Sequence, residues 1–180
     1  KYMINNGYNI GNFSSFVSVN HDRSDGHRPD SKFDITNGFA NLGYRINNQY
    51  KATGNLSLAK YNTEDPGAIT SPLLDHIMHI LRGTTSFALE NHHEKSSGAL
   101  RVFYNWGHHK INDGHAVNAD PRSFLFYSDD HNTGVQLYQS FRLVEGNTFT
   151  AGVDYKNWGG HAWNDTINGP VEEIVKKSVN

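Results

Sequence analysis

The sequence predicts an all-β protein: an antiparallel up-and-down meander of about eight strands that forms part of a transmembrane β-barrel. Short and long connections alternate strictly along the chain, with tight turns at Asn47-Asn48, Asn91–Ser96 and Val144–Gly146. The segments between them alternate apolar and polar residues with a period of two, which gives a strand one apolar and one polar face. Short turns at one end and long loops at the other are typical of outer-membrane β-barrels but are not peculiar to them.

The expected strands follow one another as hairpins. Residues 1–7 end an earlier strand and turn at Asn5-Asn6-Gly7, since Asn-Gly is a favoured tight-turn pair. Further strands are expected over residues 8–19, 33–46, 49–62, 83–91, 97–108, 132–143, 147–158 and 171–179. Long loops are expected at Asn20–Lys32, Thr63–Leu81, His109–Asp130 and Gly159–Val171. One short helical turn is expected over Pro72–Arg82, where Leu and Ile occur at mixed helical spacing.

The two faces of the expected strands differ in chemistry. We expect the convex face of the curved sheet to carry the apolar residues Leu100, Val102, Val135, Leu137, Phe149 and Val153. A soluble β-sandwich gives the same alternation, with its apolar face buried, so the pattern leaves two architectures open. Long or charged groups at mid-strand on the other face favour a wet lumen: Arg101, Arg142, Asp154 and Lys156. Aromatic residues towards the ends of the apolar face favour a lipid-facing barrel: Tyr44, Tyr50, Tyr104 and Trp106.

Composition excludes several classes of protein. The 180 residues suffice for one domain, and no apolar run is long enough for a transmembrane helix. The formal net charge is -2 without a basic cluster, so no nucleic-acid partner is expected. The absence of Cys excludes disulfides and thiolate metal sites. No Gly-rich phosphate loop or GxSxG motif occurs, and we expect no enzyme activity and no bound cofactor.

Several segments resemble TonB-dependent outer-membrane receptors. The resemblance lies in Ser24-Asp25-Gly26-His27-Arg28-Pro29-Asp30-Ser31, in Gly98–His109, in Gly134–Ser140 and in Gly146–Gly160. It covers most of the chain and lies in the pattern of the hairpins and in short loop sequences, none of which is a diagnostic signature. It implies a barrel of about 22 strands with a plugged lumen, in the outer membrane of a Gram-negative bacterium. The barrel would carry a scarce nutrient such as a ferric chelate (siderophore), haem, cobalamin or a glycan.

The chain begins at Lys1 and stops at Asn180 inside an expected strand, so we expect it to be an excerpt of a longer protein. Residues 1–180 would then be a partial β-barrel domain that lacks the plug domain and the barrel-closing strands. The resemblance implies two further partners: the lipid bilayer, and TonB, which acts through an N-terminal plug outside this chain. The residues expected to couple energy would then lie outside this chain.

Histidine is the residue whose placement points to ligand chemistry. Of the 11 histidines, all but His92 and His93 are expected in or beside the long loops. Imidazole suits transition-metal and haem ligation and titrates near neutral pH. We expect a small-molecule nutrient or metal chelate to be captured at the loop rim by His27, Arg28, His108, His109 and His115. The competing interpretation is that exposed loops simply accept polar residues and that these histidines bind nothing.

No catalytic or structural metal site is expected. His76 and His79 lack the Glu of an HExxH motif, and the loop aspartates do not form a twelve-residue calcium loop. Two functions other than nutrient uptake stay open: a soluble β-sandwich that binds carbohydrate through aromatic residues in its loops, and a passive porin-like barrel. If the histidines bind nothing, a glycan remains a possible nutrient, with Trp158 and Trp163 as the stacking platforms.

Overall fold

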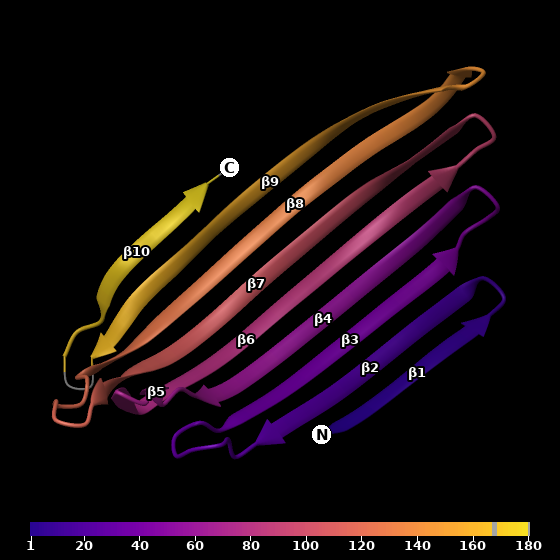
Figure 1. The fold of residues 1–180 in the computed structure, drawn as a ribbon. Coiled ribbons are helices and arrows are strands. Elements are labelled where there is room, and N and C mark those ends of the chain that lie inside the picture. The colour runs from indigo at the N-terminus through magenta and orange to yellow at the C-terminus, as the bar shows by residue number, and fades with distance from the viewer. Residues whose placement is uncertain (167–168, 180) are drawn as a thin grey trace.

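The computed structural model describes residues 1–166 and 169–179, which contain ten β-strands and no helix (Figure 1). The strands are β1 (Tyr2–Ile10), β2 (Phe13–Ser24), β3 (Phe33–Arg45), β4 (Tyr50–Glu64), β5 (Gly67–Ala68), β6 (Ser71–His92), β7 (Ser96–Ala116), β8 (Phe124–Val144), β9 (Asn147–Thr166) and β10 (Glu172–Val179). They pair in the order β1-β2-β3-β4-β6-β7-β8-β9-β10, and β5 pairs with β6 alone. All the pairings are antiparallel, so the up-and-down meander is confirmed, with ten strands where about eight were expected.

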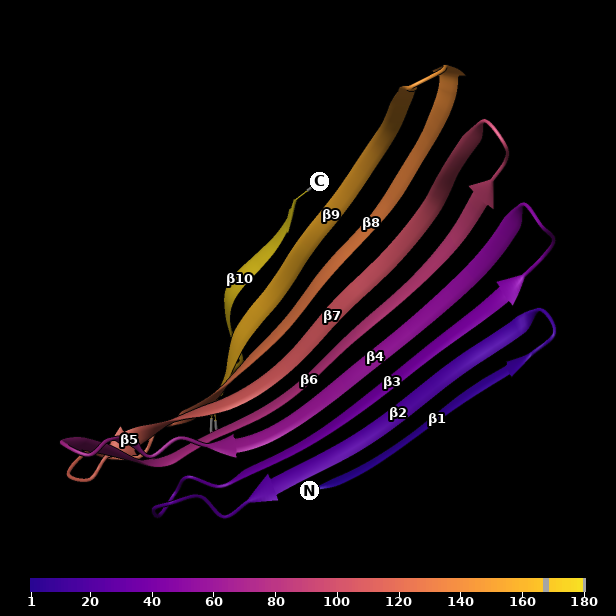
Figure 2. The ribbon, with the colours of Figure 1, turned by 45° about the vertical axis from the view of Figure 1, so that its right-hand side comes forward.

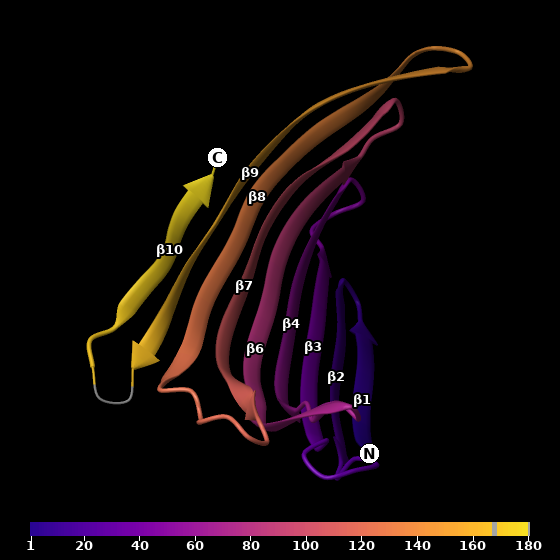
Figure 3. The same ribbon diagram turned by 60° about the vertical axis from the view of Figure 1, so that its left-hand side comes forward.

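The strands form a single curved layer with β1 and β10 at its two edges (Figures 2 and 3). Among the described residues, the only fully buried hydrophobic side chain is Ala99, whereas Tyr2 and Ile4 are 76% and 78% exposed. The described strands thus form one sheet, and no second sheet packs on it as a sandwich would require. No described helix is long and apolar enough to cross a membrane.

The tight turns lie at one end of the sheet. Those predicted between residues 46 and 49, 92 and 96, and 144 and 147 are confirmed, but the prediction of a turn at Asn5-Asn6-Gly7 is wrong. These three residues lie inside β1, where they pair with Ser18, Val17 and Phe16. The chain turns instead at Gly11-Asn12, where Gly11 has a φ of 55° that a residue with a Cβ adopts at a cost. The local Asn-Gly preference is outweighed by pairing along the whole hairpin.

Most of the predicted long loops are continuations of strands. β2 runs on to Ser24, β4 to Glu64, β7 to Ala116 and β9 to Thr166. The predicted helical turn over Pro72–Arg82 is also wrong, because this segment belongs to β6. Its backbone is paired with β7 from Leu73 onwards and with β4 from Ile77 onwards, so inter-strand hydrogen bonds replace helical ones. Of the loop predicted over Gly159–Val171, Ile167 and Asn168 lie outside the described residues.

The strand register defines two faces, because directly opposed residues of an antiparallel pair share a face. Leu100 lies opposite Leu137, and Leu137 lies opposite Val153. All six apolar residues predicted to share a face do so, and we call this the first face. Arg101, Gln136 and Asp154 lie opposite one another on the second face. The prediction of one apolar and one polar face is therefore confirmed for the half of the sheet next to the tight turns, the turn-side half.

An apolar band covers the first face of the turn-side half. Its members are Val17, Val19, Leu42, Leu56, Leu58, Phe87, Leu89, Leu100, Val102, Val135, Leu137 and Val153. Aromatic residues lie at its limits on the same face, with Tyr44 and Tyr50 at the tight-turn end and Tyr104 and Trp106 at the other. Tyr104 and Trp106 are stacked, with ring centroids 5.6 Å apart.

The polarity of both faces reverses in the loop-side half, the part of the sheet next to the long connections. On the first face, Leu58 of β4 is followed by Lys60, and Trp106 of β7 is followed by His108 and Lys110. On the second face, Ser57 of β4 gives way two rows further on to Tyr61, and Thr84 of β6 gives way to Ile80. The loop-side half therefore presents apolar residues on the second face, while Leu81, Ile77 and Tyr127 stay on the first face beside its polar residues.

The tight turns are staggered from hairpin to hairpin. The row that begins with Ile10 at the end of β1 passes through Tyr44 and Leu89 to Leu137 of β8. β8 then continues for another seven residues, to Val144, before it turns. Each successive hairpin therefore extends further beyond its neighbour, as Figure 1 shows along the ends of the strands.

Candidate ligand-binding site

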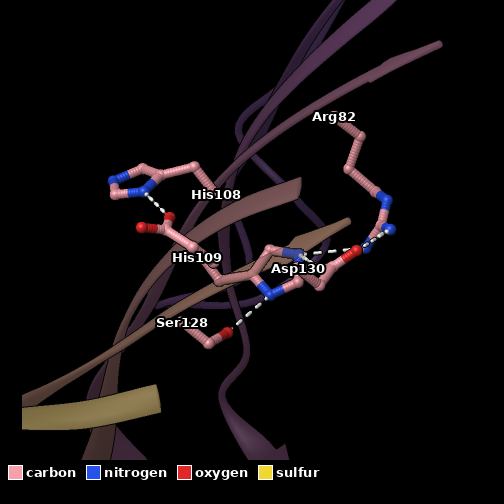
Figure 4. Close-up of polar contacts among 6 residues, drawn as sticks. Arg82, His108, His109, Ser128 and Asp130 are labelled. Carbon is pink, nitrogen blue, oxygen red and sulfur yellow. Dashed lines mark hydrogen bonds and ion pairs between the residues drawn. The ribbon is translucent and has the colours of Figure 1, made fainter. Parts of the chain in front are cut away.

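A polar cluster lies on the second face where the turn-side half meets the loop-side half. Strands β6, β7 and β8 lie side by side there and place two rows of residues in register. The first row is Arg82, Gly107 and Asp130, and the second is Ile80, His109 and Ser128. Figure 4 shows the side chains of Arg82, His109, Ser128 and Asp130 directed toward one another.

Arg82 and Asp130 reach each other across the central strand. Arg82 Nη2 donates to Asp130 Oδ1 at 2.8 Å, and Arg82 Nη1 donates to Asp130 Oδ2 at 3.3 Å, so the pair is bidentate. Gly107 lies between them, and a Cβ added there would meet Asp130 Oδ2 at 2.5 Å and the Arg82 guanidinium carbon at 3.0 Å. A glycine at this position thus lets two residues on non-adjacent strands form an ion pair.

His109 completes the cluster as a neutral ring. Its Nδ1 lies 2.9 Å from Ser128 Oγ and its Nε2 lies 3.1 Å from Arg82 Nη1. Arginine can only donate, so Nε2 is the acceptor and Nδ1 carries the proton that it donates to Ser128. Burial lowers the pKa of His109, Asp130 opposes that shift, and Arg82 adds to it. The neutral tautomer that the hydrogen bonds require is therefore also the one that burial favours.

An apolar patch adjoins this cluster on the loop-side half of the second face. Its members, which we call the outer apolar patch, are Phe33, Ile35, Tyr61, Met78, Ile80, Ile111 and Phe126. They form two neighbouring rows that cross β3, β4, β6, β7 and β8. Phe33 is 37% exposed and the others are half-buried, so the patch is a partly open apolar surface rather than a closed core.

The cluster and the patch together suit an amphipathic ligand. The Arg82 and Asp130 side chains are 46% and 39% exposed, so water screens their pairing and leaves both charges within reach of a ligand. The guanidinium has five N–H donors, of which the bonds to Asp130 and His109 occupy only part. A ligand with an apolar body and an oxygen-rich edge would find both kinds of surface next to each other.

His108 and His109 do not act together, although they are consecutive in sequence. His108 lies on the first face, where its Nδ1 is 2.5 Å from Asp129 Oδ1 and its ring is 6.4 Å from that of Tyr127. Figure 4 shows the His108 ring directed away from the cluster that contains His109. The strand continues through both residues, so the predicted loop rim that would have united them is a pleated strand with alternating faces.

The other three predicted residues lie apart from this cluster. His27 is exposed in the connection between β2 and β3. Arg28 donates through Nη2 to the backbone carbonyl of Gly67 in β5, which ties this connection to the next one, while its buried Nε has no hydrogen-bond partner. His115 lies near the end of β7, opposite Leu74 on the second face. The structure therefore separates the five predicted residues: His27 and Arg28 lie in the β2–β3 connection, His108 on the first face, and His109 and His115 on the second face.

Sequence reasoning missed Arg82, Asp130 and the outer apolar patch. The signal was present in β7 and β6, where the apolar residues change from even to odd positions in one strand and from odd to even in the other. In β7 they pass from Val102 and Tyr104 to Ile111, and in β6 from Leu89 and Phe87 to Ile80 and Met78. In the sequence prediction, the β7 strand ends at residue 108 and the β6 strand begins at residue 83. Both limits leave out the residues at which the apolar positions change face.

Among the described residues, no group of three or more His, Cys, Asp or Glu side chains is arranged to hold a metal ion. The chain matches no family model, no curated protein and no solved structure.

Proposed function

We propose that the chain is a sector of a β-barrel in the outer membrane of a Gram-negative bacterium. The barrel takes up a scarce nutrient, such as a metal chelate, haem or cobalamin, with energy delivered through TonB. The observation that carries the proposal is the apolar band on one face of a single-layer sheet, limited at both ends by aromatic residues.

A bilayer is the environment that such a band requires. Exposed residues of the band include Leu56 (40%), Leu100 (37%) and Leu137 (49%), and water would make their exposure costly. In β4 the apolar stretch runs from Tyr50 to Leu58, nine residues, and a transmembrane β-strand needs about 9–11. Aromatic girdles at both interfaces and a polar inner face belong to the same architecture.

Two alternatives are weaker on these observations. A soluble carbohydrate-binding sandwich needs a second sheet over the apolar band, and the described strands form only one sheet. A passive porin-like barrel fits the band equally well, but a water-filled pore has no need of the outer apolar patch on its inner face. The patch favours a barrel that binds its ligand. The TonB-dependent class itself rests on the resemblance of the loop and hairpin segments.

The proposed barrel separates the candidate residues by role. The second face is the lumen side, so His109, Arg82 and the outer apolar patch contact the ligand in the vestibule. His27, Arg28 and His115 give first contacts nearer the rim. His108 faces outward, beside Tyr127.

The two adjacent histidines provide a matched test of this assignment. His109→Ala in the intact protein should weaken ligand binding roughly fivefold, because a hydrogen-bonded polar group is lost from the lumen side. His108→Ala removes the same side chain one residue away and should leave binding unchanged. The measurement is the Kd of ferric chelates, haem and cobalamin for whole cells, with immunoblots of the outer-membrane fraction to show equal barrel levels.

Replacing His27, Arg28, His108, His109 and His115 together by Ala extends the test to the rim. Uptake should fall while barrel assembly stays intact. Unchanged affinity for every candidate nutrient in both the single and the fivefold variants would overturn the ligand assignment and leave the porin-like barrel as the better interpretation.

A further inference from the structure

The first face of the loop-side half contains a depression that the proposed uptake function does not use. It has a volume of about 710 Å³, and its lining side chains come from β2, β3, β4, β6, β7 and the β2–β3 connection. The residues that give it its chemistry are Arg23, Lys32, Lys60, Lys110, Asp34 and Glu64. Arg23 is paired with Asp25 at 3.7 Å, so the three lysines against two carboxylates make this depression locally positive, although the chain as a whole carries a formal charge of -2.

The lysine side chains of the depression have no acidic partner among the described residues. Among the described residues, Lys32, Lys60 and Lys110 form no ion pair, and the Nζ of Lys110 lies 5.7 Å from the centroid of the Tyr127 ring. The two carboxylates have other partners, since Asp34 pairs with His21 at 3.7 Å and Glu64 accepts the backbone N–H of Lys32 at 3.3 Å. The site is thus prepared for an anion from outside the chain.

The depression lies directly beyond the apolar band on the same face. Along β4, Leu56 and Leu58 of the band are followed on that face by Lys60 and then by Asn62. To one side, Tyr127 stacks on Trp163 with ring centroids 5.5 Å apart and an interplanar angle of 8°. Cations next to aromatic rings at the edge of an apolar surface match the layered chemistry of a lipid: acyl chains, an interfacial region and a charged headgroup.

We propose that this depression binds the phosphate-bearing headgroup of an anionic membrane lipid, whose acyl chains lie along the apolar band. Lys60 and Lys110 approach the headgroup from β4 and β7, while Arg23 and Lys32 approach it from the β2–β3 side. Several ammonium and guanidinium groups around one space favour a headgroup with more than one phosphate over a singly charged one. The inference rests on the proposed placement of the first face against lipid.

The test compares two charge-matched double variants of the intact protein in detergent micelles and in vesicles. Lys60→Gln with Lys110→Gln removes two cations of the depression. Lys51→Gln with Lys95→Gln removes two exposed cations near the tight turns. The probes are cardiolipin, which carries two phosphates, phosphatidylcholine, which carries no net charge, and inorganic phosphate. Lipid retention is measured by native mass spectrometry, and membrane insertion by flotation with phosphatidylcholine vesicles.

The unmodified protein should retain cardiolipin in preference to phosphatidylcholine. In the Lys60/Lys110 variant the ratio of retained cardiolipin to retained phosphatidylcholine should fall at least about tenfold, since each cation near an anionic lipid surface adds substantially to the attraction. The Lys51/Lys95 variant should keep it.

Insertion into phosphatidylcholine vesicles without any cardiolipin preference, or equal losses in the two variants, would overturn the lipid site alone. Displacement of cardiolipin by inorganic phosphate at matched phosphate concentration would also overturn it, because the depression would then be a phosphate site that needs no acyl chains. Failure of the unmodified protein to insert into any vesicle would instead overturn the proposed membrane placement.

Discussion

The turn-side and loop-side halves of the sheet share the same strands and yet reverse the chemistry of their faces. In the turn-side half the first face is apolar, with Leu58 and Val102, and the second is polar, with Ser57 and Arg101. In the loop-side half the first face carries Lys60 and Lys110, while the second carries Tyr61 and Ile111. The backbone pairing continues through the boundary without a break.

Strand pairing and face polarity are therefore set separately. Inter-strand hydrogen bonds depend on the backbone and hold each strand in register over its whole length. Face polarity depends on which surroundings each level of the sheet meets. In the proposed barrel, the turn-side half has lipid outside and water inside, whereas the loop-side half has water outside and a ligand inside. Such a change of surroundings would require the polarity of the two faces to reverse along each strand. Three substitution experiments test this contrast.

The largest effect is expected within the turn-side half. Leu137→Arg places a charge in the apolar band and should make membrane insertion less favourable by about 2–4 kcal/mol at mid-membrane depth. Gln136→Arg places the same charge one residue away on the second face and should insert almost normally. The measurement is folding of the intact protein into vesicles as a function of urea concentration. Equal losses for the two variants would mean that both faces are buried in protein.

Two neighbouring glycines test the boundary between the halves. At Gly83 an added Cβ would come within 2.0 Å of the Trp106 ring on the first face, whereas at Gly107 it would meet the tips of Asp130 and Arg82 on the second. Gly83→Ala should therefore destabilise the protein by about 1–3 kcal/mol, because a rigid ring stacked on Tyr104 must move. Gly107→Ala should cost under about 1 kcal/mol, because an exposed ion pair can separate. Urea unfolding monitored by tryptophan fluorescence measures both, and the reverse ranking would contradict the packing described here.

The smallest effect concerns the titration of His109 on the loop-side half. Its pKa is lowered from 6.5, first by burial, so the ring protonates more readily in the unfolded chain than in the folded one. The contribution to stability is fully present above pH 6.5 and declines as the pH falls from 6.5 toward the lowered folded pKa. Nuclear magnetic resonance of the ring should give a midpoint below 6.5. Asp130→Asn should lower that midpoint further and Arg82→Gln should raise it; opposite signs would mean that the cluster does not set the charge of His109.

The sequence predicted the hairpin order and the face assignment of the turn-side half because both depend on local signals. Apolar alternation around Leu100 and Leu137, and turn residues at Asn47 and Gly146, mark strands and tight turns without reference to distant residues. It did not predict that β6 begins at Ser71. Leu73, Leu74 and Ile77 suit a helix as well as a strand, and only pairing with β4 and β7 decides between them.

The candidate site was less predictable for a related reason. The residues were chosen for their chemistry and their expected place in loops. They fall in separate places because β7 continues through His108, His109 and His115, whereas His27 and Arg28 stay in the β2–β3 connection. Arg82 and Asp130 are 48 residues apart and meet only because β6 and β8 flank β7 at Gly107. Such a contact depends on register across three strands, which a period-two pattern within each strand does not determine.

The stagger of the tight turns has a consequence for the height of the apolar band. From the first hairpin to that of β8 and β9 the turns advance by about six or seven residues along the strands and by about six strand spacings across them. This corresponds to roughly 22 Å along and 29 Å across. If the turns lie in one plane, the strands incline by about 37° from the normal to that plane, within the range of roughly 35–45° found in closed barrels.

Nine residues from Tyr50 to Leu58 rise about 30 Å along their strand, which at this inclination spans about 24 Å of height. An outward apolar zone of about 25 Å is what a transmembrane barrel presents to lipid, and the length of the band and the slant of the hairpins together give a height close to that value.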